Sequence, residues 1–110
     1  MSANACVAFY GIRFEVAADD VEALESRSDW RMQAARKAGL KHYCDNFGLP
    51  GERYLLFVGT KLAVLGPENA AEAKFDSAEL QGMIELTRRK LAAAGLNGEP
   101  ALYLQWLPDA

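Results

Sequence analysis

The strongest constraint on the fold is an apolar run over residues 54–66, Tyr-Leu-Leu-Phe-Val-Gly-Thr-Lys-Leu-Ala-Val-Leu-Gly. Its β-forming residues occupy both alternating sets of positions, which is typical of a strand covered on both faces. We therefore expect a central strand of a sheet. The polar pair Thr60 and Lys61 follows Gly59 in the middle of the run, and this interruption predicts either a tight hairpin or a β-bulge.

Three further strands are expected. Residues 6–16 alternate between an apolar and a more polar set, and Gly11 inside them predicts a bulge or a close approach by another backbone. Residues 41–47 are polar for a strand and belong at an edge. In the last strand, residues 101–107, the expected core face consists of Leu102, Leu104 and Trp106.

Two helices carry start and stop signals. Asp19 with Glu22, and Asp76 with Glu79, have the spacing of a capping box. The first helix is expected over residues 19–39, with Met32 and Ala35 on its buried stripe. Both helices end in Ala-Gly-Leu, and the glycine of each, Gly39 or Gly95, is expected to adopt a left-handed conformation and close the helix.

The chain thus has the order strand, helix, strand, strand, helix, strand. Each half repeats a strand, an Asp-x-x-Glu helix, Ala-Gly-Leu and a strand. This resembles a duplicated split β-α-β unit, the ferredoxin-like βαββαβ plan. We predict a single α+β domain over residues 1–110, a two-layer sandwich with a mostly antiparallel sheet and two helices on one face.

Charge and composition exclude several classes of function. The formal net charge is −3, and binding to nucleic acid or to an anionic membrane depends on clustered Lys and Arg, so such binding is not expected. No run is apolar over the length of a bilayer, and the N-terminus lacks the pattern of a secretory signal. The two cysteines, without C-x-x-C spacing, are interpreted as reduced thiols of a cytoplasmic protein.

Neither a cofactor nor a metal is expected. The sequence contains no phosphate-binding or dinucleotide-binding glycine motif, and its Cys and His spacing is not that of a zinc module. A small enzyme or ligand-binding domain that uses Cys6, His42 and Cys44 is the alternative hypothesis, because a thiol beside an imidazole is an activated nucleophile. This alternative, like a Cys6–Cys44 disulfide, requires the two flanking strands to be neighbours.

Trp30 is the first candidate for contact with a partner. At 100° per residue it lies opposite the buried stripe of the first helix, beside Arg27 and Lys37. A tryptophan flanked by cations on a polar face has the composition of an interface hot spot. The alternatives are that Trp30 packs under the loop 66–74 or along its own helix.

The second candidate is an aromatic patch on the sheet face away from the helices. Alternation places Phe9, Tyr43, Phe47 and Tyr103 there. An exposed aromatic patch marks a partner surface, and a second copy stacked on it would bury it by symmetry. The alternative is a scatter of single exposed aromatic side chains.

These observations together predict a small, non-enzymatic binding module. The expected partner is a protein, either a foreign one that an inhibitor or immunity-type protein would mask, or a second copy in a homodimer. The candidate partner-binding residues are Trp30, Arg27, Lys37, Phe9, Tyr43, Phe47 and Tyr103.

Overall fold

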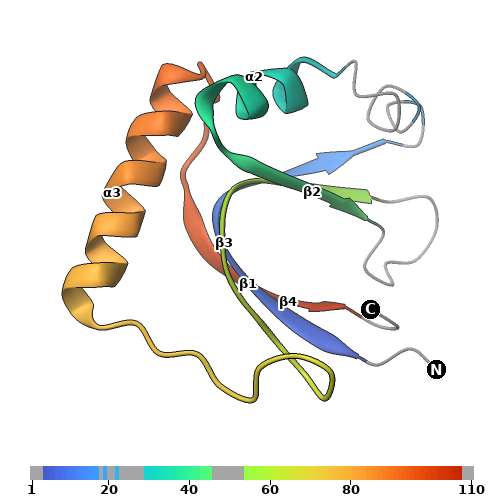
Figure 1. Ribbon diagram of the computed structural model, residues 1–110. Helices are drawn as coiled ribbons and strands as arrows, with labels where there is room; N and C mark the ends of the chain where they lie inside the picture. The colour runs from blue at the N-terminus through green and yellow to red at the C-terminus, as the bar shows by residue number, and fades with distance from the viewer. Residues whose placement is uncertain (1–3, 18, 20–21, 23–28, 46–53, 108–110) are drawn as a thin grey trace.

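The computed structural model of the protein describes residues 4–17, 19, 22, 29–45 and 54–107. Four strands and two helices lie in these residues (Figure 1). In chain order they are β1 (Ala5–Val16), α2 (Trp30–Ala38), β2 (Lys41–Asp45), β3 (Tyr54–Leu65), α3 (Ser77–Ala93) and β4 (Ala101–Leu107). The predicted α+β class is therefore confirmed.

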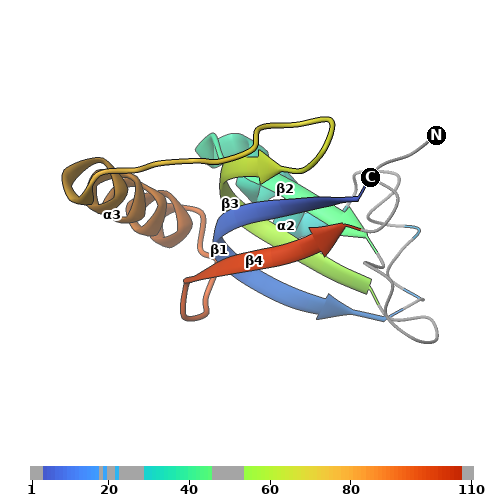
Figure 2. The same ribbon diagram turned by 90° about the horizontal axis from the view of Figure 1, so that it is seen from below.

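The strands form one antiparallel sheet in the order β2-β3-β1-β4. β3 lies between β1 and β2, and residues 55–59 are buried, so the central position expected for this strand is confirmed. The polar strand β2 lies at one edge of the sheet, also as expected. β4 occupies the opposite edge (Figure 2).

The two central strands meet at a pair of glycines. Gly11 on β1 is aligned with Gly59 on β3. A Cβ atom at Gly11 would lie 2.1 Å from the carbonyl oxygen of Val58, and one at Gly59 would lie 2.2 Å from the carbonyl oxygen of Tyr10. Neither position has room for a side chain, which confirms the close backbone approach predicted at Gly11.

β3 is one continuous strand. Of the two structures predicted for the interruption at Thr60 and Lys61, the hairpin is therefore wrong and the β-bulge is confirmed. Ala8 is aligned with Ala63 but Phe9 with Lys61, which leaves Leu62 as the extra residue.

Thr60 and Lys61 can remain within β3 because one is hydrogen-bonded and the other is in contact with water. Lys61 is exposed. The Thr60 hydroxyl lies 2.6 Å from that of Thr87 on α3. Since the Thr87 hydroxyl donates to the Met83 carbonyl at 2.7 Å, Thr60 is the donor between the two threonines. This bond ties α3 to the centre of the sheet.

The prediction of one continuous helix over residues 19–39 is wrong. Asp29 has an extended backbone (φ −64°, ψ 132°) and caps the N-terminus of α2, which begins at Trp30. An aspartate favours a cap over a helix interior because its short side chain binds nearby backbone N–H groups. Of the residues expected to precede this point in the helix, only 19 and 22 are described, and both are helical, as predicted; the remainder lie outside the described residues.

The predicted helix ends are confirmed by their hydrogen bonds. Gly39 adopts a left-handed conformation, and the Leu40 N–H donates to the Ala35 carbonyl at 2.8 Å. Gly95 and Leu96 close α3 in the same way, since the Leu96 N–H donates to the Leu91 carbonyl at 3.1 Å.

The start of α3 is also as predicted. The Asp76 carboxylate accepts the N–H of Glu79 at 2.8 Å. This bond lowers the pKa of Asp76 below its ordinary value. Neither helix of the described part is long and apolar enough to cross a membrane.

Two clusters of buried side chains lie on opposite faces of the sheet. Both helices contribute to the first, through residues such as Met32 of α2 and Leu91 of α3, which pack on Ile12, Leu56 and Val58. The second contains strand residues from the opposite face. Its buried members are Ala5, Val7, Phe9, Leu55, Phe57 and Leu107.

The prediction of which face of β4 is buried is wrong. Leu102, Leu104 and Trp106 are 52%, 71% and 54% exposed, whereas Leu107 is buried in the second cluster with Tyr103 packed against it. The alternation is correct, but the covered side is the other one. The helices pack on β1, β2 and β3, and the outer edge strand β4 extends beyond them (Figure 2).

Candidate partner-binding groove

Trp30 is held at the surface by the residues on either side of it. The carboxylate of Asp29 accepts the backbone N–H of Arg31 at 2.9 Å, and it binds the Arg31 guanidinium at 2.8 and 3.0 Å. The guanidinium carbon lies 5.3 Å from the centroid of the Phe14 ring on β1. Because both neighbours are anchored in this way, the side chain between them points to solvent, and Trp30 is 60% exposed.

The Asp29–Arg31 pair is also shielded from water. Only 9% of the Asp29 side chain and 15% of the Arg31 side chain are exposed. Hydrogen bonds from the guanidinium lower the pKa of Asp29, and this effect outweighs the rise that burial causes. The carboxylate is therefore charged at neutral pH and keeps the first turn of α2 fixed.

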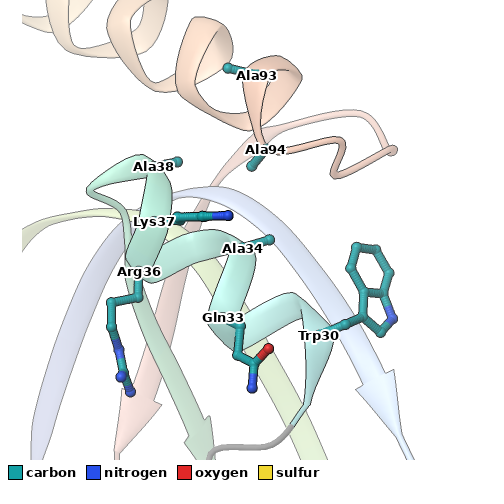
Figure 3. A pocket seen from close by; sticks show the side chains of 8 residues that line it. All are labelled: Trp30, Gln33, Ala34, Arg36, Lys37, Ala38, Ala93 and Ala94. Carbon is teal, nitrogen blue, oxygen red and sulfur yellow. The ribbon is translucent and has the colours of Figure 1, made fainter.

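A groove of about 850 Å³ lies between α2 and the C-terminal end of α3 (Figure 3). Trp30 stands at one end of it. Ala34 and Lys37 follow Trp30 at the i+4 and i+7 positions, so the three side chains share one face of the helix. The groove is lined by Trp30, Gln33, Ala34, Arg36, Lys37, Ala38, Ala93 and Ala94.

The opposite wall comes from α3. Ala34 and Ala38 of α2 face Ala94 across the groove, while the Lys37 side chain extends along it (Figure 3). Alanines on both walls leave the space open, because a methyl group does not reach across it. The groove therefore has small apolar side chains on both walls, polar side chains of α2 beside them, and an indole ring at one end.

The charge of the groove is opposite to that of the protein. Among the described residues that line it there is no Asp or Glu, whereas Arg36 and Lys37 contribute two cations. The Nζ of Lys90 is also close to this end of α2, 3.6 Å from where a Cβ at Gly39 would lie. The chain as a whole carries a formal charge of −3. A basic, partly apolar groove on an acidic protein favours an anionic ligand with apolar side chains.

Two of the predicted partner-binding residues are thus brought together. Trp30 and Lys37 line the same groove. Because Trp30 is exposed, the idea that it packs under the loop 66–74 is wrong. Arg27 lies outside the described residues.

The expected exposed aromatic patch is not a free surface. Phe9 is only 2% exposed, so its proposed role as a surface contact is wrong. Its ring lies 5.5 Å from that of Phe57, which lies 5.5 Å from that of Tyr103. The guanidinium of Arg13 covers Tyr103 at 4.7 Å.

The physical reason is that this sheet face builds a core of its own. Phe57 of β3 is part of that core. The sequence could not show this, because Phe57 is flanked on both sides by apolar residues and alternation therefore does not assign it to a face. Tyr43 is 39% exposed, and Phe47 lies outside the described residues.

Cys6, His42 and Cys44 do not form a site together. Cys44 is aligned with Leu56, which is aligned in turn with Phe14 of β1. Cys6 precedes Phe14 by eight positions on that strand, which corresponds to roughly 25 Å of extended chain. The strands are not neighbours at the level of the cysteines, both of which remain thiols. No group of three metal-binding side chains occurs within the part of the chain that is described.

No protein-family model matches the chain, and no curated protein or solved structure matches it significantly. The assignment of the groove therefore depends on its geometry and charge. The sequence pattern identified Trp30 and Lys37 but not Ala93 and Ala94. No local signal could connect these two alanines of α3 to a helix about sixty positions earlier in the chain.

Proposed function

We propose that this protein is a non-enzymatic cytoplasmic binding module that holds an acidic segment of a partner protein in the groove between α2 and α3. The observation that carries the proposal is the position of an exposed tryptophan, Trp30, at the end of a groove lined by cations and alanines. Tryptophan is among the residues most often found at interface hot spots, because burying its ring removes a large apolar area from water.

The shape and charge of the groove support the choice of ligand. Small side chains on both walls leave room for the apolar face of an amphipathic helix, the arrangement known from helix-in-groove recognition. Lys37 lies along the groove, where it can pair with a carboxylate of the partner, and Arg36 adds a second positive charge to the residues that line the groove. Binding of this kind would mask the partner segment, which is how an inhibitor or immunity-type protein acts.

We also propose that the scaffold is ferredoxin-like. In a split β-α-β unit one strand fits between the two parallel strands, so two interleaved units give the order β2-β3-β1-β4. That order, the antiparallel pairing and the position of α3 between β3 and β4 support the assignment. The fold supports many functions and does not identify the partner.

A fluorescence titration tests the binding proposal. The chain has two tryptophans, so Trp106→Phe leaves Trp30 as the only one. The probe is a synthetic amphipathic peptide with Glu on one face and Leu on the other, and its counterpart carries Lys in place of Glu. We expect a saturable blue shift of Trp30 emission with the acidic peptide alone, because the indole leaves water on binding.

Two matched charge reversals distinguish the effect of a charge in the groove on peptide binding from the effect of the protein's net charge. Lys37→Glu should weaken the acidic peptide by at least about tenfold, because it places like charges in contact. Lys74→Glu makes the same change at an exposed loop position and should have little effect. An equal response to both peptides, or equal weakening by both variants, would overturn the proposal.

A further inference from the structure

The edge strand β4 carries a row of large apolar side chains that the described fold leaves uncovered. Leu102, Leu104 and Trp106 alternate along the strand and point to the same face. In the sheet they are aligned with Tyr10, Ala8 and Cys6 of β1, respectively. Because Tyr10 accepts a hydrogen bond from Arg88 of α3, the row lies on the face that carries the helices.

The strand itself is open for further pairing. β4 pairs with β1 and, within the described part of the chain, with no other strand. Its register with β1 has no irregularity over seven residues. The backbone N–H and C=O groups on its outer side therefore form a regular edge, to which another strand can add.

The other edge of the sheet provides a contrast. Its strand, β2, begins with the exposed Lys41, and a charged residue, lysine above all, is the usual protection of an edge against pairing with another chain. The sequence of β4, Ala-Leu-Tyr-Leu-Gln-Trp-Leu, contains no charge and no proline. The protein thus protects one edge and leaves the other one apolar.

We propose that β4 pairs with β4 of a second copy in an antiparallel, two-fold symmetric dimer with a continuous eight-stranded sheet. The two-fold axis passes through Leu104, so that this residue is opposite its own copy. Leu102 is then opposite Trp106 of the second copy, and Trp106 is opposite its Leu102. Directly opposite residues in an antiparallel pair are about 4.5–5.5 Å apart at Cβ, within contact distance for these side chains.

The pattern of β4 selects a second copy as the partner. Antiparallel pairing centred on Leu104 places all six exposed apolar side chains on one face, because positions 102, 104 and 106 are symmetric about the centre. The two exposed rows then become one contiguous cluster on the face that carries the helices of both copies. A strand pair is smaller than a standard interface of about 1,600 Å², so we expect a dissociation constant in the micromolar range.

Sedimentation equilibrium over micromolar concentrations, up to about 1 mM, tests the dimer. Leu104→Glu places two carboxylates opposite each other and should weaken it by at least about tenfold. Leu86→Glu is the matched control, because Leu86 is an exposed leucine of α3 and lies outside the paired strand. Circular dichroism verifies that both variants fold. A wild-type monomer over the whole range overturns the proposal and leaves the edge to a foreign strand.

Disulfide trapping tests the register. In a Cys6→Ser, Cys44→Ser background, Leu104→Cys should form a covalent dimer on oxidation, because the two copies of position 104 are adjacent. Leu102→Cys alone should not, since position 102 is opposite position 106. The double variant with Leu102→Cys and Trp106→Cys should be trapped again. Efficient trapping at Leu102→Cys alone, or a dimer that survives Leu104→Glu, overturns the β4 pairing. Neither result bears on the α2/α3 groove.

Discussion

Asp29 and Arg31 form a two-pronged ion pair, with N–O distances of 2.8 and 3.0 Å, across the residue that separates them. That residue is Trp30, and the pair keeps it at the surface. We expect the charge of Asp29 to stabilise the fold in a pH-dependent manner. Because its pKa is lowered in the folded state, the contribution is complete above the ordinary aspartate pKa of about 4 and is lost as the pH falls through the lower, folded value.

The first prediction compares Asp29→Asn with wild type. The asparagine keeps a capping oxygen but removes the charge. We expect a lower denaturation midpoint for the variant at pH 7, and a difference that narrows below about pH 4 as the wild-type carboxylate is protonated. The control is Glu72→Gln, an exposed loop position. Thermal unfolding between pH 7 and pH 2 provides the measurement, and a constant difference over that range would contradict the role of the ion pair.

The second prediction separates Trp30 from the core residue two positions later. Trp30→Ala should change the free energy of unfolding by no more than about 0.5 kcal/mol, as at other surface positions. Met32 is buried in the first cluster, and Met32→Ala should cost about 2–5 kcal/mol. Chemical denaturation measures both values. A loss of several kcal/mol at Trp30 would show that the ring is part of the core and would remove the basis for a partner contact there.

The third prediction uses two glycines with opposite surroundings. Gly11→Ala places a methyl group against the backbone of β3 and should cost about 1–3 kcal/mol or more. Gly82 lies inside α3, and a Cβ there would meet nothing within 4 Å. Gly82→Ala should therefore stabilise the protein by about 0.5–1 kcal/mol, through the better helix propensity of alanine. Denaturation midpoints measure both changes in stability. If both substitutions stabilised the protein, or both destabilised it, the two glycines would not differ in their surroundings as described.

The fourth prediction concerns amide exchange in β3. Leu56, Phe57 and Val58 are buried between two neighbouring strands, so their amides should exchange only when the whole domain unfolds. Exposed residues 67–74 are the internal comparison and should exchange much faster. Hydrogen exchange followed by NMR measures both sets. Rapid exchange at the three β3 amides would be incompatible with the central position of this strand.

The sequence by itself determined the features that depend on near neighbours in the chain. The end of α2 at Gly39 and Leu40, and the start of α3 at Asp76, follow from hydrogen bonds between residues three to five positions apart. The central position of β3 also follows, because a strand apolar on both faces must be covered on both. A further local feature, the cap at Asp29, was present in the sequence but was concealed by the helical spacing on either side of it.

The tertiary structure alone decided which faces are buried. Alternation in β4 defines two faces, but the position of the helices determines which one is covered, and they leave Leu104 and Trp106 exposed. Phe9 is buried for the same kind of reason, because Phe57 from a distant part of the chain packs against it. The groove likewise needs residues of α2, such as Ala34, and Ala94 of α3 to line the same space. Burial depends on contacts between residues far apart in sequence, whereas a periodic pattern records only how neighbouring side chains alternate.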